Sequence, residues 1–168
     1  EGVVMASTMA ISMLSGAALP VNYFTAKLAL TEMARVRAGD KVLIECATGG
    51  VGVLAIQLAR HLGAEVTGLT TSPHKKPFIE GLGAKALTKA EWLADATATG
   101  YDFILNASGG AEIQPQRARL GITGRMVCIG ISSGVKVGKR SFVRMGMAAL
   151  RTPRISILLV SQAVAFAI

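Results

Sequence analysis

The sequence predicts an α/β fold with a doubly wound, parallel, six-stranded sheet and helices on both of its faces. Short aliphatic runs alternate with segments of helical periodicity, which is the pattern of repeated strand–helix–strand units. Apolar residues make up 51% of the chain and aromatic residues only 5%, as in an aliphatic sheet buried on both faces. The 168 residues suffice for one domain with its own core, which we expect to span residues 1–168.

The apolar runs and the turn residues set the expected elements. Strands are expected at residues 41–46, 65–70, 85–87, 101–107, 124–131 and 163–168. Helices are expected within 16–38 and at 51–63, 74–82, 111–121 and 140–151, while 89–100 reads as either helix or loop. Pro20 is expected to start the first helix, Gly63 to end the second, and Pro77 to lie in the first turn of the third. The apolar run 155–168 is shorter than the roughly 20 residues of a membrane span, so it is expected to end a buried helix before the last strand.

The charge is strongly basic, at a net +8, with a run of lysines and arginines between residues 136 and 154. We interpret this run as a solvated face or the rim of a partner surface. Nucleic acid is disfavoured because no aromatic residues are interleaved to stack bases. No basic signal segment follows Glu1, and Cys46 and Cys128 lie in apolar runs without metal-ligand spacing. These features predict a cytoplasmic protein with buried thiols and no zinc bound by this chain.

Glycines are concentrated where the first strand feeds the second helix. Ala47, Gly49 and Gly52 follow the dinucleotide-binding spacing G-x-G-x-x-G, with alanine at the first position. Gly49 is expected to permit the tight turn, and Gly50 and Gly52 to let the backbone approach a phosphate and the helix pack on the strand. The free N–H groups at the helix start would then bind a pyrophosphate.

The end of the second strand indicates which dinucleotide is bound. NAD-binding domains carry a carboxylate about 20 positions beyond the glycines, where it holds the ribose 2′-hydroxyl. Here the sequence has Thr70 and Ser72, with Lys75 and Lys76 following. A hydroxyl and an ammonium suit a 2′-phosphate, so NADP(H) is predicted. The alternative is that the two lysines are an exposed charge pair.

The segment AGDKVLIECATGGVGVLAIQLAR, residues 38–60, resembles the quinone oxidoreductase (zeta-crystallin) branch of the medium-chain dehydrogenase/reductase superfamily. AALPVNYFTA, residues 17–26, is similar to its vesicle amine transport relatives. The resemblance extends over residues 17–168 and departs from the family at Thr48, where the family has a smaller residue.

The resemblance implies a Rossmann domain that binds NADP(H), in an enzyme that needs no zinc. Hydride would pass from NADPH to a quinone or to the β-carbon of an α,β-unsaturated carbonyl. A GroES-like catalytic domain, absent from this chain, would supply the rest of the pocket, so the isolated domain is expected to be inactive. A homodimer would form through the last strand, Ala163 to Ile168.

The resemblance also implies a cofactor site, residue by residue. It places Asn22, Thr25, Ile129 and Gly130 near the nicotinamide end, Thr48, Gly49, Gly50, Val51 and Gly52 at the pyrophosphate, Thr70, Ser72 and Lys75 at the adenosine ribose and its phosphate, and Asn106 and Ala107 near the adenine ribose. Asn22 reads equally as a helix cap. Lys89 or Trp92 stands where the family often has a tyrosine near adenine. No catalytic residue and no metal ligand is assigned, because the cofactor carries the hydride step.

Two other functions are left open. One is a module that resembles the vesicle amine transport relatives, associates with membranes or proteins and has secondary redox activity. The basic run 136–154 favours this function. The other is an enoyl reductase module of a polyketide or fatty acid synthase. Such modules often carry a lysine as proton donor just after the fifth-strand glycine, where this chain has Ile131. Ile131 therefore argues against this alternative, and quinone reduction, or enone reduction with a proton from solvent, is expected instead.

Overall fold

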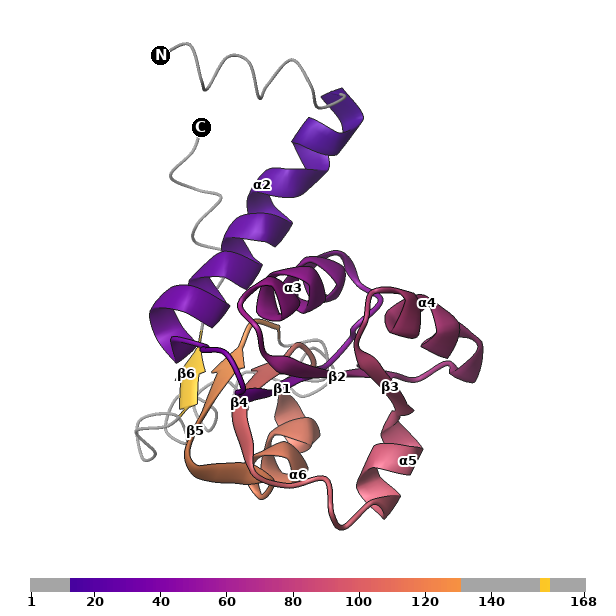
Figure 1. Ribbon diagram of the computed structural model, residues 1–168, viewed down its shortest axis with the longest axis vertical. Coiled ribbons are helices and arrows are strands. Elements are labelled where there is room, and N and C mark those ends of the chain that lie inside the picture. Colours follow the sequence, from indigo (N-terminus) through magenta and orange to yellow (C-terminus); the bar gives the residue numbers. More distant parts are fainter. Residues whose placement is uncertain (1–12, 131–154, 158–168) are drawn as a thin grey trace.

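The computed structural model describes residues 13–130 and 155–157, and these form one parallel sheet of six strands in the order β3-β2-β1-β4-β5-β6 (Figure 1). The strands are β1 (Lys41–Ile44), β2 (Glu65–Thr70), β3 (Lys85–Thr88), β4 (Tyr101–Asn106), β5 (Leu120–Cys128) and β6 (Ile155–Ile157). All neighbouring pairs are parallel. The predicted doubly wound α/β fold is confirmed, with five strands in the continuous stretch and the sixth separate from it.

The sixth strand is not the one that was predicted. Residues 155–157 were expected to end a helix, but they pair with β5, with Met126 opposite Ile155 and Cys128 opposite Ile157. Two β-branched isoleucines in three residues favour an extended backbone over a helix. The predicted strand 163–168 and the predicted helix 140–151 lie outside the described residues.

Helices cover both faces of the sheet. They are α2 (Met13–Lys27), the π-helix η1 (Leu28–Ala34), α3 (Gly50–His61), the 3-10 turn η2 (Pro73–Lys75), α4 (Lys76–Gly81), α5 (Lys89–Ala94), the 3-10 turn η3 (Gly110–Glu112) and α6 (Ile113–Arg117). In Figure 1, α2, α3 and α4 lie on one side of the sheet and α5 and α6 on the other.

Each face of the sheet packs into its own apolar cluster. Val42 and Ile44 belong to the cluster formed with α2, η1, α3 and α4, while Leu43 between them belongs to the cluster with Trp92 and Met126. All three strand residues are fully buried. The uninterrupted run of apolar residues in β1 therefore follows from burial on both faces.

The helix ends show where turn chemistry predicted well and where it did not. α3 ends at His61, and Gly63 follows with φ 83°, its N–H and that of Ala64 bonding back to the carbonyls of Arg60 and Ala59. Pro77 lies at the start of α4, as predicted. Pro20, by contrast, lies inside α2, which begins seven residues earlier at Met13, so the expected start was wrong.

One helix end depends on a contact distant in sequence, and another on a local capping motif. The carbonyls of Met33 and Ala34, at the end of η1, accept from the guanidinium of Arg125 in β5 at 3.2 and 3.3 Å. The segment left open as helix or loop contains α5. The Thr88 hydroxyl accepts from the N–H of Glu91 at 3.2 Å, and the Glu91 carboxylate accepts from the N–H of Thr88 at 2.7 Å. This reciprocal cap starts a helix of only six residues.

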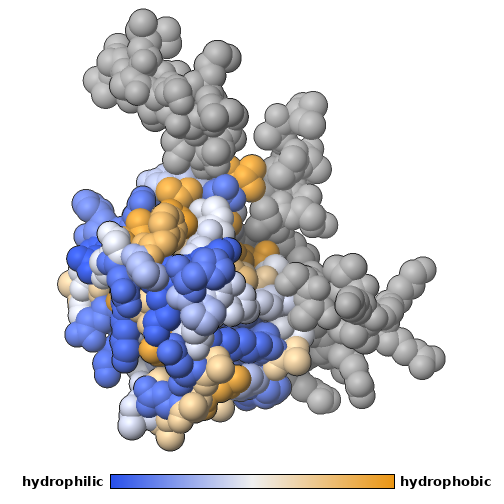
Figure 2. All heavy atoms as spheres, turned by 90° about the vertical axis from the view of Figure 1, so that its right-hand side faces the viewer, coloured by the Kyte–Doolittle hydropathy of each residue, from blue (hydrophilic) through white to orange (hydrophobic). Residues whose placement is uncertain are grey.

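Of the seven large apolar side chains that are exposed among the described residues, four lie on α2 and η1, and the others are Phe78, Leu93 and Ile122. Val21, Tyr23 and Phe24 on α2 and Leu28 in η1 are all exposed, and Phe24 is 64% exposed. The face seen in Figure 2 is instead mostly hydrophilic, with apolar residues in separate small patches. Within the described residues, no helix combines the length and the apolar character needed to cross a membrane.

Candidate functional site

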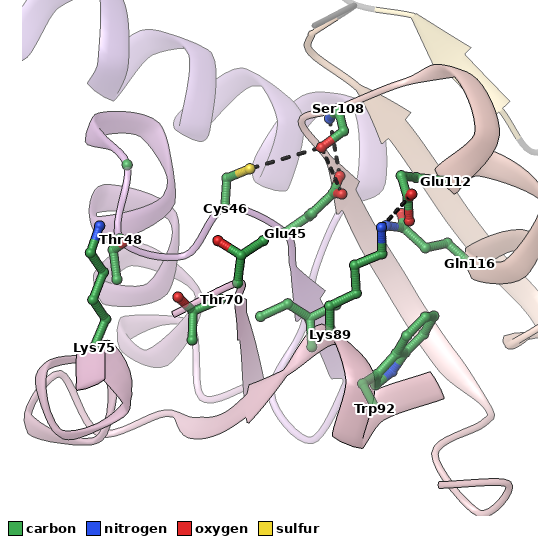
Figure 3. A pocket seen from close by; sticks show the side chains of 13 residues that line it. Glu45, Cys46, Thr48, Thr70, Lys75, Lys89, Trp92, Ser108, Glu112 and Gln116 are labelled. Atoms are coloured by element: carbon green, nitrogen blue, oxygen red, sulfur yellow. Dashed lines mark hydrogen bonds and ion pairs between the residues drawn. The ribbon is translucent and has the colours of Figure 1, made fainter. Parts of the chain in front are cut away.

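A pocket of about 340 Å³ opens at the carboxyl ends of β1, β2 and β4, beside the start of α3 (Figure 3). The chain order of the strands reverses between β1 and β4, and ligands of doubly wound sheets bind at this reversal. The residues that line the pocket are Glu45, Cys46, Thr48, Gly49, Leu69, Thr70, Thr71, Lys75, Lys89, Trp92, Ser108, Glu112 and Gln116. Four of the predicted site residues are among them: Thr48, Gly49, Thr70 and Lys75.

The turn between β1 and α3 takes its unusual conformation at Cys46 and not at a glycine. Cys46 has φ 52°, in the left-handed region, and its carbonyl accepts from the N–H of Gly49 at 2.9 Å. Gly49 has φ −80° and ψ 166°, which any residue can adopt. The prediction that Gly49 permits the tight turn was therefore wrong, because the residue with the left-handed backbone is Cys46. A Cβ on Gly49 would lie 3.2 Å from the Cys46 oxygen, so compact packing is what favours a glycine there.

Gly52 is needed for close approach to the backbone that follows β1, whereas Gly50 lies against a side chain. A Cβ on Gly52 would lie 2.3 Å from the Cys46 oxygen and 2.9 Å from the backbone of Ala47, so only glycine lets α3 start this close to the end of β1. A Cβ on Gly50 would lie 2.6 Å from the side-chain nitrogen of Asn22. That contact places Asn22 of α2 beside the first turn of α3.

The start of α3 suits an anion. Its N-cap is Gly49, which has no side chain to cap the helix. The N–H groups of Gly50, Val51 and Gly52 lie in the first turn, where a helix has no internal acceptors. The 12 residues of α3 align their peptide dipoles with the positive end at this turn. The local chemistry fits the phosphates of a dinucleotide.

The end of β2 adds hydroxyl groups and a cation to the pocket. Thr70 is buried, and its hydroxyl oxygen accepts from the N–H of Ser72 at 3.2 Å. Thr71 and Lys75 also line the pocket, and the Lys75 side chain extends toward the turn that carries Thr48 (Figure 3). Lys76 instead pairs with Glu91 at 3.0 Å. Of the two neighbouring lysines, only Lys75 faces the pocket, and Ser72 is not among the lining residues.

A buried carboxylate at the end of β1 was not predicted. Glu45 is 7% exposed, and one of its oxygens accepts from the N–H groups of Ala107 and Ser108 at 2.9 and 3.0 Å. Its other oxygen accepts from the Ser108 hydroxyl at 2.8 Å. Both oxygens of the Glu45 carboxylate thus accept hydrogen bonds from the loop after β4.

Asn106 lies beneath that loop. It is fully buried, donates from its amide nitrogen to Gln116 at 2.9 Å, and accepts from the N–H of Gly109 at 2.8 Å. Ser108 and Gln116 line the pocket, whereas Asn106 and Ala107 do not. Contact of Asn106 or Ala107 with a ligand stays a prediction.

The residues predicted at the nicotinamide end also lie outside the pocket lining. The Thr25 hydroxyl donates to the carbonyl of Val21 at 2.6 Å within α2. The N–H of Ile129 donates to the carbonyl of Asn106 at 2.9 Å, and a Cβ on Gly130 would lie 2.1 Å from the carbonyl oxygen of Ala107. Ile129 and Gly130 therefore continue the β4–β5 contact just beyond the strands.

The far side of the pocket is formed by α5, η3 and α6. Lys89 forms an ion pair with Glu112 across it (Figure 3). Trp92 is only 1% exposed; its indole N–H donates to the Tyr101 hydroxyl at 3.3 Å, and the Arg119 guanidinium lies 4.1 Å from its ring centre. Of the two residues suggested at the adenine position, Lys89 presents a polar group and Trp92 forms part of the core.

Comparison with known proteins gives the family. A family model described as zinc-binding dehydrogenase matches residues 50–162, about two thirds of the chain. The chain belongs to the zinc-binding dehydrogenase family. Its fold and its glycine-rich strand–helix turn are those of the nucleotide-binding domain of a medium-chain dehydrogenase/reductase.

Relatives of this dehydrogenase domain include synthase components and free-standing reductases. The spectinabilin polyketide synthase system protein NorB of Streptomyces orinoci is 42% identical over 120 residues, which are 68% of this chain and 6% of NorB. The CurK enoyl reductase structure matches with TM-score 0.68 and 30% identity, over 89% of this chain and 45% of that one. The quinone oxidoreductase of Thermus thermophilus, solved also with NADPH, matches with TM-score 0.65 and 28% identity, over 90% of this chain and 48% of that one.

The domain therefore spans less than half of the structures it matches and a small part of NorB. These relatives support the superfamily and a pyridine nucleotide, but they divide between enoyl reductases and quinone oxidoreductases. The quinone oxidoreductase branch that the sequence resembled remains a prediction.

One of the two thiols of the dehydrogenase domain differs from expectation. Cys128 is buried, as predicted, and burial raises the pKa of its thiol to about 11. Cys46 is exposed and lines the pocket, so its predicted burial was wrong. Desolvation, followed by the nearby charge of Glu45, raises the pKa of Cys46. Among the described residues, no group of three or more histidine, cysteine or acidic side chains could hold a metal ion.

Proposed function

We propose that this chain is the NADPH-binding part of a reductase that adds hydride to the β-carbon of an α,β-unsaturated carbonyl. The observation that carries the proposal is the cationic corner of the pocket, where the start of α3, with its glycine N-cap, lies near Lys75. The sequence has hydroxyl groups at the end of β2, at Thr70 and Thr71, and no carboxylate there that would repel a 2′-phosphate.

In this proposal each part of the pocket holds one part of the cofactor. The N–H groups of Gly50, Val51 and Gly52 bind the pyrophosphate, with Thr48 and Gly49 forming the turn beneath it. Thr70, Ser72 and Lys75 bind the ribose and its 2′-phosphate. Asn22, Thr25, Ile129 and Gly130 are assigned to the nicotinamide end, and Asn106 and Ala107 to the adenine ribose. The bound nicotinamide supplies the hydride, and the residues of this chain bind and orient the cofactor.

The choice of an enone substrate rests on the relatives. NorB and the highly reducing polyketide synthase anuA of Penicillium roqueforti are synthase components, and CurK is an enoyl reductase. Ile131, the residue that speaks against a lysine proton donor, lies outside the described residues. We therefore propose an enoyl reductase whose proton comes from solvent. Reduction of a free quinone is the second candidate, supported by the likeness to the Thermus thermophilus enzyme.

The other expectations also stand as proposals. A GroES-like catalytic domain would complete the nicotinamide pocket, and the apolar side chains exposed on α2 and η1 are consistent with a surface that another domain covers. A homodimer through residues 163–168, a cytoplasmic location and independence of zinc remain predictions. Membrane association through residues 136–154 concerns a segment outside the described residues.

Cofactor preference tests the proposal directly. In the full-length protein we expect NADPH to bind at least tenfold more tightly than NADH, because about 1.4 kcal/mol of phosphate contact corresponds to that ratio. Lys75→Ala should remove the preference by weakening NADPH alone. Lys76→Ala is the matched control: Lys76 is the adjacent lysine and is paired with Glu91, so the preference should persist. Equal affinities of the wild-type protein for the two cofactors would refute the assignment.

Turnover then separates the two candidate substrates. We expect NADPH oxidation with a 2-enoyl thioester, such as a crotonyl thioester, at a higher kcat/KM than with a benzoquinone. A higher kcat/KM with the quinone would favour the second candidate and leave the cofactor assignment intact.

A further inference from the structure

Glu45 extends the contact between β1 and β4 at the point where the pocket opens. Its N–H donates to the carbonyl of Leu105 at 3.0 Å, continuing the ladder one residue past β1. At Cys46 the chain then turns away, with φ 52°. Beyond this point the backbone of β1 no longer reaches the chain that follows β4.

The side chain of Glu45 bridges the gap left by that turn. Its carboxylate accepts from two successive backbone N–H groups, those of Ala107 and Ser108, and from the Ser108 hydroxyl. Successive N–H groups that converge on one point form a small anion-binding nest. Here the anion is the protein's own carboxylate, so these two N–H groups are occupied before any phosphate arrives.

The loop that Glu45 holds touches both ends of the predicted cofactor site. On one side Ser108 lines the pocket. On the other side the carbonyl of Ala107 lies so close to Gly130 that a Cβ there would be 2.1 Å away. A displacement of this loop would therefore alter the pocket wall and the end of β5 together.

The charge of Glu45 works against an anionic ligand. Glu45 lines the pocket into which we place the phosphates of NADPH, and its field contributes to the raised pKa of both Cys46 and Cys128. A negative charge at this place disfavours a polyanion, so attraction does not explain it. Its hydrogen bonds to the loop give it a structural reason.

We infer that Glu45 is a positioning residue, whose hydrogen bonds hold the loop of Ala107 and Ser108 in the shape that admits the nucleotide. This inference rests on the proposed function and adds a residue to it. It makes a counter-intuitive prediction, because the bonds and the charge of Glu45 have opposite effects on cofactor binding.

Three variants of the full-length protein separate these effects. Glu45→Ala removes both the bonds and the charge. Glu45→Gln removes the charge alone, since a glutamine oxygen can accept from both N–H groups while its amide donates to the Ser108 oxygen. Asp102→Ala is the matched control: the Asp102 carboxylate accepts from the N–H of Lys41 at 2.9 Å, joining the same two strands at their far end from the pocket.

The measurements are NADPH affinity and amide hydrogen exchange over residues 106–110. For Glu45→Ala we expect affinity to fall at least tenfold and the N–H groups of Ala107 and Ser108 to lose protection. For Glu45→Gln we expect protection to persist and affinity to equal or exceed that of the wild type. For Asp102→Ala both quantities should stay within twofold of the wild type.

The inference is overturned if Glu45→Ala binds NADPH as tightly as the wild type. It is also overturned if Glu45→Gln is as weak as Glu45→Ala, or if Asp102→Ala is equally weak, since a general loss of stability would then explain the effect. Failure of the proposed function looks different: the wild-type protein itself would bind no NADPH, while the exchange experiment would still report on the loop.

Discussion

Gly52 gives the sharpest test of how the helix and the first strand create the site. In Gly52→Ala the new methyl group would lie 2.3 Å from the Cys46 oxygen and 2.9 Å from two backbone atoms of Ala47. All three neighbours are backbone, so no flexible side chain can move aside. Either α3 or the turn must shift by about 1 Å to restore ordinary contact.

The expected magnitude follows from two opposing effects. Overpacking a buried site costs about 1–3 kcal/mol, and the upper part of that range applies where backbone must move. Replacing glycine by alanine within a helix returns up to about 1 kcal/mol. The net loss is about 2 kcal/mol, which for a domain of this size lowers Tm by about 4–8 °C. Because the shift displaces the N–H groups that we assign to the pyrophosphate, NADPH affinity should fall at least tenfold.

Thermal unfolding and nucleotide titration of the full-length protein measure both effects. Gly81→Ala is the control, because Gly81 is the last residue of α4 and a Cβ there would meet nothing within 4 Å. That variant should leave affinity unchanged and alter stability by less than about 1 kcal/mol. If Gly52→Ala unfolds and binds NADPH like the wild type, the close approach of α3 to the strand end does not matter and the reasoning fails.

Two further predictions concern the thiol of Cys46 and the Arg119 clamp, by which we mean the hydrogen bonds from Arg119 to α5 and to the residues that follow it. Because the pKa of Cys46 is raised, its alkylation by iodoacetamide should have a pH midpoint above that of an unperturbed thiol, and Glu45→Gln should lower that midpoint. Bound NADPH should slow the alkylation, since Cys46 lines the pocket. An ordinary midpoint that Glu45→Gln leaves unchanged would contradict the raised pKa. Arg119 donates to the carbonyls of Trp92, Leu93, Asp95 and Ala98. Arg119→Met should therefore lower stability by about 2 kcal/mol and shift the emission of Trp92, the one tryptophan of these 168 residues, to longer wavelength. The control is Arg117→Met at the exposed end of α6, and equal stability of the two variants would rule out the clamp.

The sheet was predictable because its determinants are local. Buried parallel strands require short aliphatic runs, and each helix between them is indicated by its spacing and by a turn residue such as Gly63 or Pro77. The glycines before α3 were predictable for the same reason, since a helix packed hard on a strand end excludes side chains at fixed positions. Local rules failed at Pro20, which lies inside α2, and at residues 155–157, where the addition of an edge strand depends on pairing with β5.

The side chains that complete the pocket were harder to predict, because their roles depend on tertiary contacts. Glu45 follows an aliphatic strand and reads as a polar strand end, and only the fold brings it to Ala107 and Ser108, 62 and 63 residues further on. Cys46 looked like a buried thiol because its neighbours in sequence are apolar. The left-handed turn directs it outward instead.

The two adjacent lysines show how a distant residue resolves what local sequence leaves open. Lys75 and Lys76 have the same charge and the same reach, and the sequence alone allows both to be a solvated pair. Glu91, fixed at the start of α5 by its reciprocal cap with Thr88, accepts from Lys76 at 3.0 Å and so holds it away from the pocket. Lys75 forms no ion pair with the described residues and lines the pocket. The capping of a six-residue helix thus determines which cation is available to a phosphate.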